Sequence, residues 1–173
     1  MSTKKLTELA LLTAVALIIF VIELRIPNLV PIAGVKLGLA NIITVYAVFR
    51  YKPNETAMVV TARLLLGAMF SGTIVSLLYS VSGAFLCLVG MLSLRNIIPK
   101  NWIWLCSITG AIFHNIGQIL MALVLMKTTA VLASLPILMI SGCIAGAFTG
   151  LCAQLLLNRL ERRNSTQNQN HEI

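Results

Sequence analysis

The sequence contains no aspartate, and charged residues make up only 10% of its 173 residues. Its five glutamates are scattered near the ends of apolar segments, so we expect neither paired-carboxylate catalysis nor carboxylate-bound magnesium. The chain also lacks a Walker motif for nucleotide phosphates and a nucleophile-elbow motif around a serine. These absences predict that the protein is not an enzyme by itself and that any energy input comes from a partner or a gradient.

The number and spacing of the cysteines and histidines argue against a disulfide-stabilised or metal-binding protein. The four cysteines, Cys87, Cys106, Cys143 and Cys152, form no CxxC pair and have no histidine at metal-ligand spacing. All four fall in apolar segments, where a free thiol behaves as a small hydrophobic group. We therefore expect no disulfide framework, no metal site and no cofactor.

Apolar residues are what the sequence has in abundance. They make up 58% of the chain, which excludes a disordered protein and an ordinary soluble domain. The net charge of +8 does not indicate a nucleic-acid partner, because no basic face interleaved with aromatic residues occurs outside the apolar segments. We expect an all-α integral membrane protein, with one six-helix transmembrane domain over residues 1–163 and a disordered cytoplasmic tail over residues 164–173.

The apolar segments predict six crossings of the membrane. Segment 6–24 is expected to be retained rather than cleaved as a signal peptide, because no small-residue cleavage site follows it. Residues 56–94 are apolar for about twice the length of one crossing and must reverse, and we expect the reversal at Ser71-Gly72-Thr73. The remaining expected helices are 37–49, which is short for a span, 102–126 and 135–157.

The basic residues predict the orientation of the chain. One set of helix ends carries Lys4, Lys5, Arg50, Lys52, Arg95, Lys100, Arg159, Arg162 and Arg163, whereas the other carries Arg25, Lys36 and Lys127. Because an excess of lysine and arginine marks the cytoplasmic face, both termini are expected there, with the protein in the plasma membrane.

The segment 102–126 contains a dense run of hydrogen-bonding side chains, His114, Asn115 and Gln118. A polar side chain in hydrocarbon costs free energy unless it finds a partner or a water-filled cavity. On a helix His114 and Gln118 share a face, and Asn115 lies about 100° away from His114. These groups either tie helices together or contact a ligand, and we favour the ligand because intramembrane polar clusters usually mark substrate pathways.

Further residues are candidates for the same outward-opening pocket. Asn41, like His114, is expected in the outer half of the membrane. Tyr79 would supply an aromatic wall, and Lys36 would bind an anionic group unless it is a solvated anchor. The loop 27–36 before the second helix is expected to act as a lid. Arg63 has three possible roles, which are to reach the cytoplasmic surface, to tie helices together or to form the floor of the pocket.

Small residues predict two close packing surfaces. Ala10 and Ala14 form an AxxxA strip on the first helix, on which another helix would pack closely. Gly142, Gly146 and Gly150 form a tandem GxxxG seam on the last helix. Neither pattern indicates any chemistry.

A set of sequence patterns spread over roughly residues 6–157 points to a known family. The patterns are Gly34-Val35-Lys36-Leu37-Gly38-Leu39-Ala40-Asn41-Ile42, Arg63-Leu64-Leu65-Leu66-Gly67, Ser76-Leu77-Leu78-Tyr79-Ser80 with Gly83, Gly110-Ala111-Ile112-Phe113-His114-Asn115-Ile116-Gly117-Gln118, and Leu135-Pro136. As a set they resemble the membrane family labelled heptaprenyl diphosphate synthase component I, also called the Gx transporter family.

That family in turn resembles the S components of energy-coupling factor (ECF) transporters, six-helix proteins that capture a vitamin or similar nutrient from outside. There, an AxxxA strip on the first helix docks a coupling subunit driven by two ATPases, and Ala10 and Ala14 match this strip. The resemblance implies a substrate-binding subunit for uptake of a nutrient, vitamin or cofactor precursor, with a small-molecule ligand, membrane lipid and an ECF coupling subunit with its ATPases as partners.

The family label implies an alternative, a non-catalytic membrane accessory component of heptaprenyl diphosphate synthase in isoprenoid or quinone biosynthesis. Prenyl synthases resembling that name hold magnesium through aspartate-rich motifs, and this chain has no aspartate. It would therefore present or accept an isoprenoid for a soluble partner. A channel-like or purely structural protein is the third interpretation.

Overall fold

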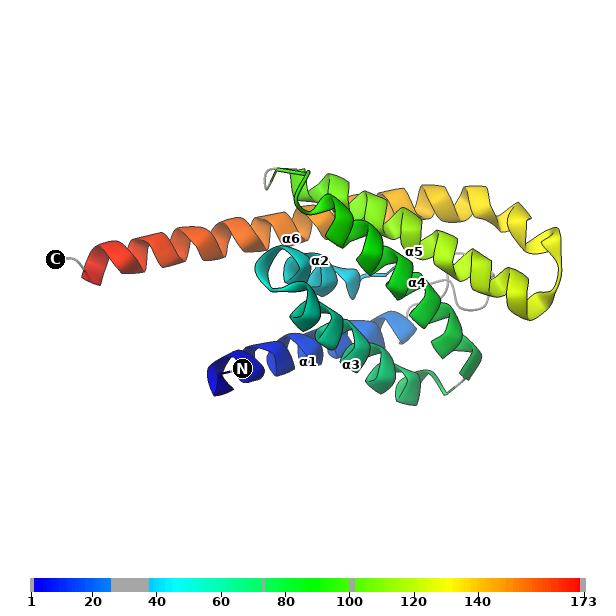
Figure 1. Ribbon diagram of the computed structural model, residues 1–173, viewed down its shortest axis with the longest axis horizontal. Helices are drawn as coiled ribbons and strands as arrows, with labels where there is room; N and C mark the ends of the chain where they lie inside the picture. The colour runs from blue at the N-terminus through cyan, green and yellow to red at the C-terminus, as the bar shows by residue number, and fades with distance from the viewer. Residues whose placement is uncertain (1, 26–37, 73, 100–101, 172–173) are drawn as a thin grey trace.

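The computed structural model describes residues 2–25, 38–72, 74–99 and 102–171 (Figure 1). In these residues the protein is all-α, as predicted, with six α-helices and one short 3-10 helix. The helices are α1 (Thr3–Arg25), α2 (Asn41–Arg50), α3 (Pro53–Ser71), α4 (Ile74–Leu94), α5 (Ile103–Met126), η2 (Thr129–Ser134) and α6 (Leu135–His171).

Among the described residues, four helical segments are long and apolar enough to cross a bilayer. They are α1, α4, α5 and the segment that joins η2 to the apolar part of α6. The protein is therefore a multi-pass membrane protein. The helix α2 has only ten residues, about 15 Å of length, against a hydrocarbon core of about 30 Å. The expected number of six crossings remains a prediction.

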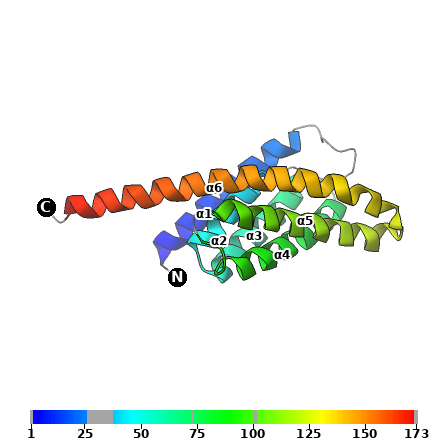
Figure 2. The same ribbon diagram turned by 90° about the horizontal axis from the view of Figure 1, so that it is seen from above.

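The short helix α2 lies inside the bundle. Its six consecutive residues from Ile43 to Val48 are all buried, which is the pattern of a helix surrounded on every side. The main core joins it to three other helices through Val45, Tyr46, Val48, Cys87, Met91, Ile103, Cys106, Ala153 and Leu157. Figure 1 shows α1 and α3 below α2 and α6 above it, and Figure 2 shows α6 extending past the other helices toward the C-terminus.

The turns between helices follow from single residues with left-handed backbone. Gly72 has φ +69° and ends α3, and Ile74 begins α4. This confirms the reversal predicted at residues 71–73. Lys127 has φ 50° and ends α5, also where the sequence predicted an end. The helix α6 continues to His171, well past Leu157, because no glycine or proline interrupts the chain after Gly150.

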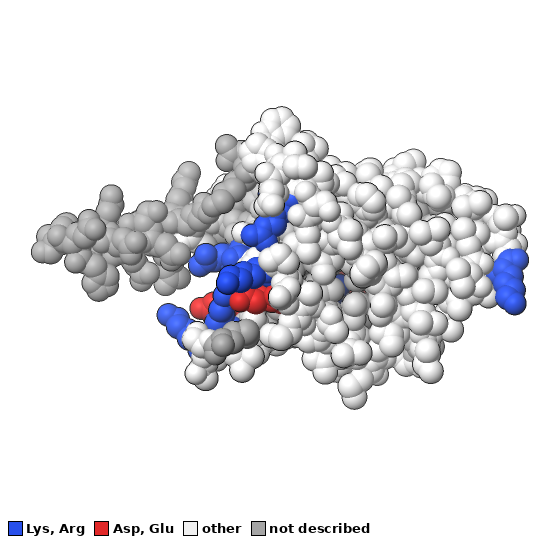
Figure 3. Space-filling view, in the orientation of Figure 1, with Lys and Arg blue, Asp and Glu red and all other residues white. Residues whose placement is uncertain are grey.

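Basic side chains gather at one end of the bundle, where α1 begins and where α2 and α4 end (Figure 3). The described members of this group are Lys4, Lys5, Arg50, Lys52, Arg95 and Arg159. Arg25, at the end of α1, and Lys127, after α5, belong to the opposite end. The helices thus divide the basic residues between two ends, and the side of the membrane on which each end lies remains a prediction.

Candidate functional site

A polar cavity of about 50 Å³ lies inside the bundle, where five helices face one another. This volume has room for a few water molecules. Phe20, Leu64 and Leu77 supply apolar parts of the wall. The polar side chains that line it are Glu23, Asn41, Arg63, Ser76, Ser80, His114 and Gln118. Seven polar side chains around one hollow in an apolar bundle make this cavity the candidate site.

Glu23 reaches the cavity because of its position on α1. Leu9, Ala16 and Glu23 recur every seven residues and are all buried, so they share the inner face of the helix. Glu23 is only 5% exposed, and its carboxylate accepts a hydrogen bond from the backbone N–H of Gly38. Glu23 was not predicted as a site residue, because the glutamates lie near the ends of apolar segments. The seven-residue spacing was the available signal.

Arg63 places a cation in the cavity wall. Thr56, Val60 and Arg63 follow the spacing of one helix face and are all buried, with Arg63 only 8% exposed. The guanidinium charge interacts with that of Glu23, which lines the same cavity. Among the three roles that the sequence left open, reaching the cytoplasmic surface requires an exposed guanidinium. The burial of Arg63 leaves the two internal roles.

The structure brings His114 and Gln118 of α5 together with Asn41, the first residue of α2. The sequence analysis expected these three side chains to share a pocket. A Cβ at Gly83 of α4 would lie 2.9 Å from Cε1 of His114, so the glycine makes room for the imidazole. The Nδ1 atom of His114 is buried and has no hydrogen-bond partner in the described part of the chain. The imidazole therefore retains hydrogen-bonding capacity for a ligand or a water molecule.

Asn115 has a different role from its two neighbours. Its side-chain amide donates a hydrogen bond to the backbone carbonyl of Leu138 on α6, with an N–O distance of 2.5 Å. It also lines a second cavity of about 20 Å³, to which Asn41 and His114 contribute as well. Because Asn115 lies about 100° round the helix from His114, one side chain ties α5 to α6 while the other faces the main cavity.

One predicted pocket residue on α4 does not line the cavity, and another lies outside the described residues. Tyr79 is buried on α4, but Ser76 and Ser80 are the polar residues of α4 that line the cavity. These serines are one turn apart and share a face from which Tyr79 is rotated by about 80°. The sequence analysis did not select them for the pocket, although their spacing in an apolar helix was visible. Lys36 and the proposed lid over residues 27–36 lie outside the described residues.

The two small-residue patterns differ in exposure. One is exposed, and the other is packed against a neighbouring helix. Ala10 and Ala14 are exposed on α1. The glycines of α6, by contrast, face the backbone of α5. A Cβ at Gly146 would lie 2.8 Å from Cα of Ile108, and a Cβ at Gly150 would lie 2.6 Å from Cα of Trp104. Gly142 faces the side chain of Asn115.

Among the described residues, the site therefore combines one cation, one carboxylate and five neutral hydrogen-bonding side chains. In the described part of the chain, no group of three or more histidine, cysteine or glutamate side chains is arranged to hold a metal ion. The arrangement suits recognition of a charged polar group, because it offers donors and acceptors in a confined space.

Comparison with known proteins identifies the family. Over residues 12–156, the sequence matches the family model described as Heptaprenyl diphosphate synthase component I. No curated protein and no solved structure matches the chain significantly. The match covers most of the chain, including every residue of the candidate site. The chain therefore belongs to the heptaprenyl diphosphate synthase component I family.

Proposed function

We propose that this protein is a non-catalytic membrane subunit that binds the anionic group of a small ligand in the polar cavity. The observation that carries this proposal is Arg63, a cation in the wall of a cavity inside an apolar bundle. Burying a charge costs free energy, so a guanidinium in such a place usually has a specific task. Its planar set of N–H donors fits a carboxylate or a phosphate.

The other side chains of the cavity support the same ligand chemistry. Gln118 and Asn41 offer amide donors, and His114 has a free ring nitrogen. Glu23 opposes the charge of Arg63 and is itself engaged by the N–H of Gly38. A ligand group with one negative charge would add hydrogen bonds to Arg63, and it would bring the summed charge of Arg63, Glu23 and the ligand from zero to −1.

The first candidate role is that of the membrane accessory component of heptaprenyl diphosphate synthase. The family match favours it. A prenyl diphosphate combines an anionic head, which suits Arg63, with a long apolar chain, which suits the lipid-facing sides of the helices. In this role the protein presents or accepts the isoprenoid, and a soluble partner carries out the condensation.

The second candidate role is that of an S-component-like subunit for ECF-type uptake. The exposed positions of Ala10 and Ala14 on α1 favour it, because a helix of a coupling subunit would pack closely on this strip. In this role the basic end of the bundle and both termini are cytoplasmic, and the cavity receives its ligand from outside.

Native mass spectrometry of the protein purified in a mild detergent tests the binding function. We expect a retained ligand with an anionic group in the wild type and in Arg95→Gln, a matched loss of charge at the basic end. We expect the ligand to be lost from Arg63→Gln. Equal retention by both variants would contradict the proposed site.

Affinity purification separates the two candidate roles. Co-purification with a soluble prenyl synthase supports the accessory role. Co-purification with an ECF coupling subunit, abolished by Ala10→Trp, supports the uptake role. An association with the coupling subunit that Ala10→Trp leaves unchanged would exclude the proposed docking strip.

A further inference from the structure

The basic end of the bundle contains an open cleft that is separate from the polar cavity. It has a volume of about 350 Å³ and lies between the first turns of α1 and the end of α2. Its lining residues are Ser2, Lys4, Lys5, Glu8, Arg50 and Tyr51. Three cations and one carboxylate therefore face the same space, which attracts an anion.

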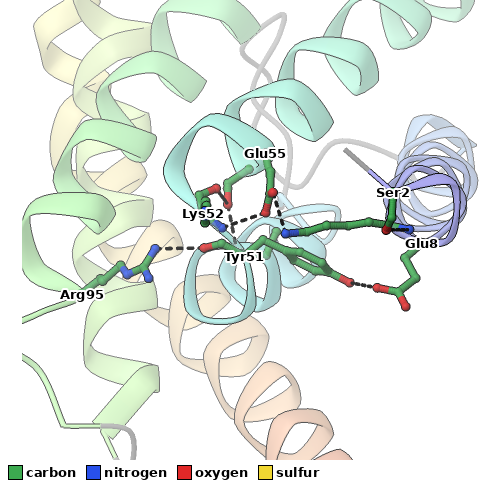
Figure 4. A network of polar contacts seen from close by, with 9 residues as sticks. Ser2, Glu8, Tyr51, Lys52, Glu55 and Arg95 are labelled. Atoms are coloured by element: carbon green, nitrogen blue, oxygen red, sulfur yellow. Dashed lines mark hydrogen bonds and ion pairs between the residues drawn. The ribbon is translucent and has the colours of Figure 1, made fainter.

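Some of the charged side chains of the cleft form ion pairs or hydrogen bonds within the protein, in a network of polar contacts (Figure 4). Lys5 Nζ lies 2.6 Å from Glu55 Oε1, and the Tyr51 hydroxyl donates a hydrogen bond of 3.3 Å to Glu8 Oε2. Arg95 Nη1 donates to the backbone carbonyl of Tyr51 at 3.0 Å. Burial raises the pKa of Tyr51 to about 12, so the hydroxyl keeps its proton and continues to bind Glu8.

The two remaining cations of the cleft are Lys4 and Arg50. Both are exposed, and no partner for either is found among the residues described. They come from different helices, Lys4 from the start of α1 and Arg50 from the end of α2. The network at Tyr51 holds these two helix ends together, so the two charges are kept beside one cleft.

An apolar stripe runs along α1 from this cleft. Lys4, Leu11 and Ile18 recur every seven residues and share one face with Val15 and Ile22. Leu11 is 66% exposed and Ile18 is 59% exposed. From Leu11 to Ile22 the helix rises about 16 Å, which is close to half of the roughly 30 Å hydrocarbon core. The stripe therefore has the length of one leaflet.

We propose that this cleft binds the head group of an anionic phospholipid, with its phosphate between Lys4 and Arg50 and an acyl chain along the stripe. The pair of cations accounts for the phosphate, because a basic pocket beside a membrane-spanning helix attracts anionic head groups. The stripe is what favours a lipid over a free phosphate, since only a lipid has an apolar part to cover it.

The test uses the full-length protein in a neutral maltoside detergent, titrated with phosphatidylglycerol or phosphatidylcholine and followed by native mass spectrometry and thermal unfolding. We expect phosphatidylglycerol to bind more tightly and to raise the melting temperature. The double variant Lys4→Gln/Arg50→Gln should weaken its binding about thirtyfold, from two cation contacts of ordinary strength.

Two further variants make the test specific. Lys4→Arg/Arg50→Lys keeps both charges and should keep the preference for phosphatidylglycerol. Arg25→Gln/Lys127→Gln removes the same number of charges from the opposite end and should change the affinity less than twofold. An equal loss in this last variant would overturn the proposal, as would equal binding of phosphatidylcholine or equal stabilisation by inorganic phosphate.

Discussion

Two parts of the molecule pack their helices in different ways. Between α4, α5 and α6, glycines let one backbone approach another. A Cβ at Gly117 would lie 2.6 Å from the backbone oxygen of Ser82, and a Cβ at Gly146 or Gly150 would lie 2.8 or 2.6 Å from a Cα atom of α5. Between α1 and α3, side chains separate the helices, and Gly67 faces the ring of Phe20. The polar cavity lies where these two kinds of packing meet.

The two kinds of packing hold different residues of the polar cavity. The glycine seams give α5 a fixed position against its neighbours, because backbones in contact leave no space to move. His114 and Gln118 are carried by this fixed helix, whereas Glu23 and Arg63 are carried by the side-chain-packed pair α1 and α3. A ligand that bridges Arg63 and His114 would therefore join the two parts of the molecule.

The largest effect on stability is expected from breaking the charge balance in the cavity. Arg63→Met removes the charge of Arg63 that opposes the buried Glu23 carboxylate and should lower the free energy of unfolding by about 3 kcal/mol. Glu23→Gln/Arg63→Met should restore most of that loss, because neither charge remains. Thermal unfolding in detergent measures both. A double variant as unstable as the single one would show that the two charges are not coupled.

The next largest effect on stability is expected when a glycine is replaced by alanine in each of the two kinds of packing. Gly117→Ala should lower the free energy of unfolding by about 2 kcal/mol, since the new Cβ would meet backbone that cannot easily move. Gly67→Ala serves as its matched control, because its Cβ would meet the ring of Phe20 at 3.0 Å. The ring can rotate away, so the loss should be less than half as large. Equal losses would contradict the distinction between the two parts.

Two neighbouring residues of α5 are expected to have different roles. Replacing one should lower stability, and replacing the other should weaken ligand binding. Asn115→Ala should cost about 1 kcal/mol of stability, because the hydrogen bond to the carbonyl of Leu138 is lost. His114→Ala should instead weaken ligand binding about tenfold while stability changes little, since the imidazole has an unpaired buried nitrogen. Isothermal titration with the identified ligand and thermal unfolding measure the two effects. The reverse pattern would show that His114 is the structural residue.

The smallest expected effect on stability comes from an ionised carboxylate at the basic end of the bundle. The hydrogen bond from Lys5 holds the pKa of Glu55 below its ordinary value of 4.5. The ionised carboxylate therefore stabilises the fold above pH 4.5, and this contribution is lost as the pH falls through the lowered pKa. The melting temperature of the wild type should exceed that of Glu55→Gln at neutral pH. The difference should shrink in acid below pH 4.5, and a difference that grows there would refute the assignment.

The sequence predicted much of the fold because local signals decided it. Apolar segments of membrane-spanning length predicted α1, α4, α5 and α6, and Gly72 predicted the reversal between α3 and α4. The end of α6 was predicted too early, since the loss of apolar character at Leu157 does not stop a helix that meets no glycine or proline.

The candidate site was predicted only in part. Spacing on one helix placed His114 and Gln118 on a common face, and the structure has both in one cavity. Spacing alone did not show that Asn115 would meet α6, or that serines rather than Tyr79 would line the wall from α4. Those outcomes depend on how each helix is rotated against its neighbours, which the order of residues along one helix does not specify.

By itself, the sequence determined that this is a helical membrane protein, because composition and apolar length act residue by residue along the chain. Only the tertiary structure decided that Glu23 and Arg63 share a cavity with His114, although 91 residues separate Glu23 from His114 in the numbering. The physical reason is that the cost of a charge in an apolar interior depends on what surrounds it in space.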